Sequence, residues 1–87
     1  MPKILVLDNE ECRTMEEACN WLREAYIYEP YNIWLEESKY GDCIEMEANR
    51  GNPGGESYTF YSFEDILRFI GKDNKNYIKE VDYNELD

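Results

Sequence analysis

Hydrophobic residues recur along this chain with two different spacings, and the changes between them predict the elements. The segment Lys3 to Leu7 is almost continuously apolar, which is typical of a short strand buried on both faces. We expect an acidic turn at residues 8–11. Thr14 and Glu17 then match a capping box, which predicts that a helix begins there.

Behind Thr14 the apolar spacing becomes helical. The stripe consists of Met15, Ala18, Cys19, Leu22 and Tyr26, and Trp21 and Ala25 widen it. Pro30 disfavours helical geometry in the residue before it. We therefore expect this first helix to end near Tyr28.

From residue 31 the spacing changes to two. Tyr31, Ile33 and Leu35 alternate with Asn32, Trp34 and Glu36, which predicts a strand. A hairpin turn is expected at residues 38–42 and a second strand at 43–48, where Ile44, Met46 and Ala48 alternate with Cys43, Glu45 and Glu47. The glycine-rich residues 50–55 predict a mobile connection, and residues 57–61 predict a third strand.

A second helix is expected to start at Ser62, which suits an N-cap, and to stop at Gly71. Its apolar stripe consists of Phe63, Ile66, Leu67 and Ile70. Residues 77–83 fit either a strand or a short helix. The order is β-α-β-β-β-α-(β), which predicts an α+β fold for residues 1–87: a single small domain with an antiparallel sheet and two helices on one face. The uncovered face of that sheet would carry Trp34, Glu36, Glu45 and Glu47.

The net charge of the chain disfavours some classes of binding partner. The 87 residues contain nine Lys and Arg against twenty Asp and Glu, so the net charge is 9 − 20 = −11. Such a chain repels phosphates, which disfavours direct binding to nucleic acid and to anionic membranes. No apolar run approaches the roughly 20 residues of a membrane span. The odd count of three cysteines is typical of reduced thiols, so we expect a cytoplasmic protein.

The sequence contains few of the residue patterns that catalysis needs. Histidine is absent, which excludes Ser-His-Asp and Cys-His machinery, and no acidic run has the spacing of a calcium loop. Cys19 belongs to the first helical stripe. Cys43 is expected to face solvent, where Asp42 and Glu45 would disfavour its thiolate. We therefore expect neither an enzyme nor a cofactor or metal site.

The acidic excess points instead to a basic protein partner. A charge of −11 exceeds the magnitude of about 2–8 that favours solubility in a small domain. Carboxylates at positions i and i+2 of a strand, such as Glu45 and Glu47, lie roughly 6.6 Å apart. That distance is near twice the phosphate repeat of about 3.4 Å along one DNA strand. The candidate partner-binding residues combine acids with exposed aromatics: Trp34, Glu36, Glu37, Tyr40, Asp42, Glu45, Glu47 and Tyr61.

The whole chain resembles small acidic α+β inhibitors encoded by phages and mobile elements, among them anti-CRISPR and anti-restriction proteins. The resemblance is carried by size, acidic excess, absent histidine and tyrosine-rich strands such as residues 57–61. It implies stoichiometric inhibition of a nuclease or CRISPR effector by nucleic-acid mimicry. The alternatives are an immunity protein or antitoxin that neutralises a basic toxin, and an unrelated adaptor. The oligomeric state is left open.

Overall fold

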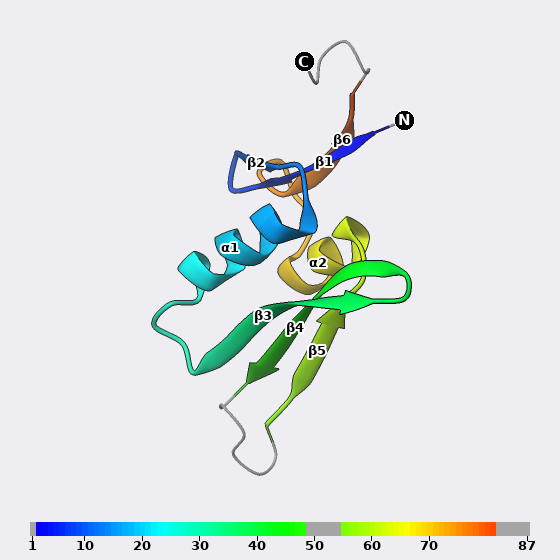
Figure 1. The fold of residues 1–87 in the computed structure, drawn as a ribbon. Coiled ribbons are helices and arrows are strands. Elements are labelled where there is room, and N and C mark those ends of the chain that lie inside the picture. Colours follow the sequence, from blue (N-terminus) through cyan, green and yellow to red (C-terminus); the bar gives the residue numbers. More distant parts are fainter. Residues whose placement is uncertain (1, 49–54, 82–87) are drawn as a thin grey trace.

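In the computed structural model, which describes residues 2–48 and 55–81, two helices lie between two three-stranded antiparallel sheets (Figure 1). This arrangement confirms the predicted α+β class. One core cluster joins both sheets to both helices. The strands nevertheless divide into two sheets where we expected one, because the N- and C-terminal strands pair with each other and not with the central three.

The first sheet contains β1 (Lys3–Leu7), β2 (Glu10–Cys12) and β6 (Tyr77–Glu80), with β1 in the middle. Leu5 and Leu7 of β1 belong to the main core. Ile4 and Val6 point to the opposite side, where they form a second small cluster with Val81. The predicted burial of this strand on both faces is therefore confirmed.

The expected turn at residues 8–11 was wrong for Glu10 and Glu11, which belong to β2. The turn is confined to Asp8 and Asn9, whose φ angles are 49° and 66°. Asp and Asn tolerate this left-handed region better than most residues. The tight turn brings Glu11 opposite Val6, and ion pairs with Lys79 and Arg13 compensate its charge.

Helix α1 (Met15–Ala25) begins as predicted, because the Glu17 backbone N–H donates to Thr14 Oγ1 at 3.1 Å. It ends at Ala25, three residues before the expected Tyr28. Tyr26 leaves the helical conformation and its ring packs edge-on against Tyr31, with 5.2 Å between centroids. Helix α2 (Phe63–Ile70) has Ser62 as N-cap and ends at Gly71, whose φ of 102° favours glycine. Both of its predicted ends are confirmed.

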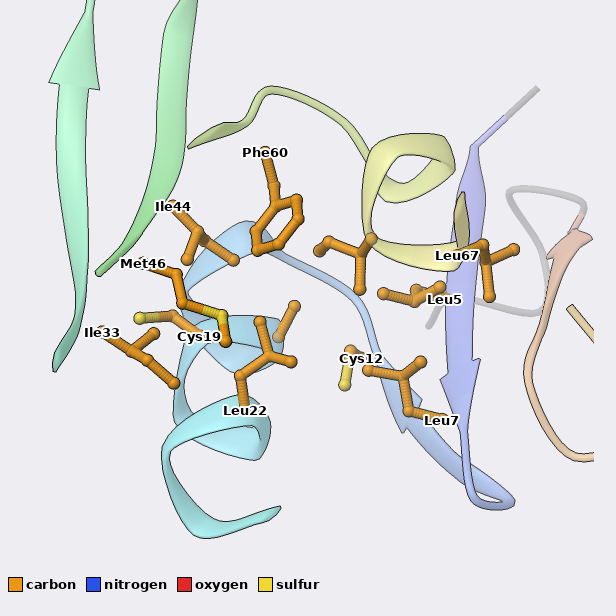
Figure 2. Close-up of a cluster of buried hydrophobic side chains, with 12 residues drawn as sticks. Leu5, Leu7, Cys12, Cys19, Leu22, Ile33, Ile44, Met46, Phe60 and Leu67 are labelled. Carbon is orange, nitrogen blue, oxygen red and sulfur yellow. The ribbon is translucent and has the colours of Figure 1, made fainter. Parts of the chain in front are cut away.

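The second sheet contains β3 (Tyr31–Ser38), β4 (Gly41–Ala48) and β5 (Ser57–Phe60), in that order. Ile33 pairs with Met46, and Ile44 pairs with both Leu35 and Phe60. Figure 2 shows Ile33, Ile44, Met46 and Phe60 pointing toward Leu22 and Cys19 of α1. This face of the sheet is therefore the helix-facing side.

Two remaining predictions concern residues 77–83 and residues 50–55, which extend beyond the described part of the chain. Residues 77–80 form a strand, which decides between the two alternatives for the C-terminal segment, although residues 82–83 lie outside the described part. The connection expected at residues 50–55 also lies outside it, apart from Gly55. No helix within the described ranges has both the length and the apolarity needed to cross a bilayer.

Leu22 and Ile66 are fully buried in the core that joins the layers. Replacing either with Ala should lower the free energy of unfolding by about 2–5 kcal/mol, because each change leaves a cavity. Urea denaturation monitored by circular dichroism measures the effect. Glu24→Ala on the exposed side of α1 serves as the control and should change stability by less than about 0.5 kcal/mol. Equal midpoints for all three variants would contradict the helix packing.

Candidate functional site

The second sheet has one face against the helices and one face turned away from them (Figure 1). We call the second one the open face. Strand alternation and the register assign its residues, which are mostly polar. They are Asn32, Trp34 and Glu36 of β3, Cys43, Glu45 and Glu47 of β4, and Ser57 and Thr59 of β5.

The centre of the open face is a cross-strand row formed by Trp34, Glu45 and Thr59. Thr59 Oγ1 lies 3.1 Å from Glu45 Oε1 and 3.0 Å from Oε2, and it donates to this carboxylate. All three side chains are partly exposed. The hydrogen bond holds the Glu45 carboxylate beside Trp34 and keeps it accessible from outside.

A second carboxylate is held by the indole ring. Trp34 Nε1 donates to Glu36 Oε2 at 3.1 Å, two residues further along the same strand and on the same face. Glu47 follows Glu45 on the open face, and its carboxylate makes no hydrogen bond or ion pair with any described residue. The face thus presents three carboxylates around one tryptophan.

The charges of these carboxylates are not compensated locally. Residues 31–48 and 55–61 contain six Asp and Glu against Lys39 alone, a net charge of 1 − 6 = −5. Lys39 Nζ lies over the Tyr40 ring at 5.1 Å, in the turn between β3 and β4. The ion pairs found within the described ranges all involve other segments: Lys3–Glu64, Arg13–Glu11, Arg68–Asp65 and Lys79–Glu11. The second sheet therefore carries net negative charge without an ion pair of its own among the described residues.

The structure brings together only part of the predicted site. Trp34, Glu36, Glu45 and Glu47 share the open face, as expected. Glu37 and Asp42 pair with each other across β3 and β4, but alternation directs both to the helix-facing side, where they are exposed near the end of the hairpin. Tyr40 is 80% exposed in the turn, and Tyr61 is 59% exposed just after β5. These four residues border the open face and do not belong to it.

The burial of Cys43 differs from the prediction. It lies on the open face, yet it is only 3% exposed, so the predicted solvent-facing thiol is wrong. Its side chain is short and lies on the central strand, between the longer neighbours Glu36 and Glu45. Burial is the main cause that raises the pKa of this thiol, and the negative charges of Glu45 and Glu36 raise it further.

The other two thiols are also poor nucleophiles. Burial raises the pKa of Cys12 to about 11, with additional contributions from Glu17 and Glu10. Burial likewise raises the pKa of Cys19, which belongs to the main core. Within the described ranges no three His, Cys, Asp or Glu side chains come close enough to hold a metal ion. What the open face exposes is negative charge beside one aromatic ring.

Sequence reasoning missed two exposed features. Thr59 could have been predicted as a member of the acidic face. The alternation of residues 57–61 directs its side chain away from the side of Phe60 and to the same side as the acids. Ile27 and Tyr28 are 63% and 97% exposed between α1 and β3. We did not predict that these two residues are exposed, because the expected helix end near Tyr28 placed both of them in the last turn of the helix.

All three thiols should resist modification in the folded protein. Their raised pKa values lower the thiolate fraction at pH 8, and burial hinders access by the reagent. Reaction with a disulfide reagent should be slow in buffer and fast for all three in concentrated urea. One thiol that reacts in buffer as fast as free cysteine, mapped to Cys43 by mass spectrometry, would contradict its burial.

Comparisons of the chain with protein-family models, with curated proteins and with solved structures gave no match in any of the three.

Proposed function

We propose that this chain is a non-enzymatic binding protein whose open face occupies a basic surface of a nucleic-acid-handling partner and blocks it by mimicry. The observation that carries the proposal is the set of three accessible carboxylates on one sheet face, none of which has an ion-pair partner among the described residues. Complementary charge would steer such a face toward a basic groove and fix its orientation there.

The geometry supports mimicry in particular because the charges are held in place. Glu36 is bonded to Trp34 and Glu45 to Thr59, so these carboxylates lose little additional freedom on binding. Glu45 and Glu47 follow each other on one strand at roughly 6.6 Å. Trp34 adds aromatic surface beside them, and tryptophan is enriched among residues that dominate binding energy.

An immunity protein or antitoxin acting on a basic toxin would use the same physics, and the identity of the partner separates the two. Affinity capture from the native host, with the wild-type chain and with Glu45→Lys/Glu47→Lys as bait, supplies the partner. The proposal expects a nucleic-acid-binding protein retained by the wild-type chain alone and released by competing nucleic acid. A toxin without a nucleic-acid site would favour the immunity function, and capture by both baits would refute a role for the open face.

Reversing the charges of the open face should slow association with the partner. For Glu45→Lys/Glu47→Lys we expect the association rate constant to fall by about tenfold or more at low salt, because electrostatic steering becomes repulsion. Stopped-flow or surface plasmon resonance measures this rate. The fold should persist, since both side chains are partly exposed and point away from the helices.

A matched pair controls for net charge. Glu24→Lys/Glu29→Lys makes the same charge change at exposed positions on α1 and in the following loop, away from the open face. We expect a much smaller decrease in the association rate for this pair. Equal decreases for both pairs, or a rate that does not respond to salt between about 50 and 300 mM, would contradict steering by this face.

The isolated protein should not bind nucleic acid. Its charge of −11 repels phosphates, and at about 150 mM salt this repulsion is only partly screened. Fluorescence anisotropy with labelled DNA and RNA duplexes and micromolar protein is expected to show no change. Saturable binding would overturn mimicry, because a mimic competes with nucleic acid for the partner and does not bind it.

A further inference from the structure

We propose that the open face recognises guanidinium groups, so that its partner presents arginine rather than lysine at the contact. This inference rests on the proposed function and specifies the chemistry of the partner. It is argued from Trp34 and the two carboxylates held next to it, Glu36 and Glu45. Charge complementarity alone would favour either cation equally, so a preference for arginine depends on the aromatic ring and on the acceptors beside it.

The indole ring offers a surface for a planar cation. Its only polar atom, Nε1, is already bonded to Glu36, so the part of Trp34 that remains exposed is aromatic. Cations are attracted to the faces of aromatic rings, most strongly to tryptophan, and arginine makes such contacts more often than lysine. A guanidinium can also stack flat on the ring, whereas an ammonium cannot.

The carboxylates next to the ring retain acceptor capacity. Glu45 lies directly opposite Trp34 in the cross-strand register. Thr59 has a single hydroxyl proton to donate, whereas an ionised carboxylate has about four lone-pair sites. Both oxygens share this one hydroxyl proton, so Glu45 keeps lone pairs that can accept further N–H bonds from outside. Arginine offers five N–H donors spread over a planar group, which can reach such acceptors while the group lies on the ring, whereas the three donors of lysine sit on one nitrogen.

None of the ion pairs of the described residues involves Glu36, Glu45 or Glu47, and Arg23, which lies beside β3, donates through Nε to the Ile33 carbonyl oxygen. Lys39, the one basic residue in residues 31–48 and 55–61, lies over Tyr40 in the hairpin turn. An arginine from outside would thus meet an aromatic surface and a fixed carboxylate at once. A lysine would meet the same negative charge, but it is more strongly hydrated and has no planar group to stack.

The test compares octa-arginine with octa-lysine, which carry the same charge. Isothermal titration calorimetry at about 150 mM salt measures both affinities for the wild-type chain. We expect octa-arginine to bind several-fold more tightly. In Trp34→Leu the ratio of the two affinities should fall by about two- to fivefold, the size of an exposed cation–π contact. Trp34→Phe keeps an aromatic ring and should give an intermediate ratio.

Two further variants make the result specific. Tyr28→Leu removes another exposed aromatic ring, 97% exposed and away from the open face, and should leave the ratio unchanged. Trp21→Phe leaves Trp34 as the only tryptophan, so octa-arginine should change its fluorescence more than octa-lysine does. Circular dichroism checks that each variant folds.

The outcomes separate this inference from the proposed function. Equal binding of both peptides that is lost in Glu45→Lys/Glu47→Lys refutes the arginine preference and leaves a basic partner supported. A preference that is unchanged in Trp34→Leu refutes the assignment of this preference to the indole ring, since arginine would then be favoured without it. Failure of both peptides to bind the wild-type chain, or equal binding to Glu45→Lys/Glu47→Lys, would count against both proposals.

Discussion

Ile33 of β3 lies opposite Met46 of β4, and this register decides what both faces of the second sheet present. Because side chains alternate along a strand, burying Ile33, Ile44 and Met46 against the helices directs Trp34, Glu45 and Glu47 outward. A slip of one residue would place two carboxylates in the core and the aliphatic residues in water. The requirement that carboxylates stay out of the core therefore also determines that they lie on the open face.

The placement of charge follows from this division. On the first sheet and α2, several acids are paired with bases, as in the ion pairs of Lys3 with Glu64 and Lys79 with Glu11. On the second sheet the fixed carboxylates are bonded only to neutral donors, Trp34 and Thr59. Uncompensated like charges oppose the compact state. A basic partner would relieve that repulsion, which links the energetics of this sheet to the function we propose.

Local sequence patterns were sufficient to predict much of the fold. The N-caps Thr14 and Ser62, the stop at Gly71 and the alternating faces of β3 and β4 are all encoded by neighbouring residues, and the structure confirms them. Long-range pairing was not accessible in this way. The three-residue strand β2 has two glutamates and no apolar alternation, and its position depends on β1 and on Lys79. The division into two sheets depends on the pairing of β1 with β6, some seventy residues away, on which local periodicity carries no information.

The candidate site was predictable to a similar extent. Alternation grouped Trp34, Glu36, Glu45 and Glu47 correctly on one face. It could not show that Cys43 on the same face is buried, because that depends on the longer side chains around it. Nor could it show that Thr59 and Trp34 hold two of the carboxylates, since these contacts need the observed register and rotamers.

The central claim is that binding occurs on the open face, and backbone amide chemical shifts test it most directly. A nitrogen-15-labelled sample would be titrated with the captured partner, or with octa-arginine in its place. The account predicts that the largest shift changes lie on β3, β4 and β5 and include Trp34, Glu45 and Thr59, together with the Trp34 indole N–H. Changes concentrated on α1, on α2 or on the first sheet, with β4 unaffected, would contradict it.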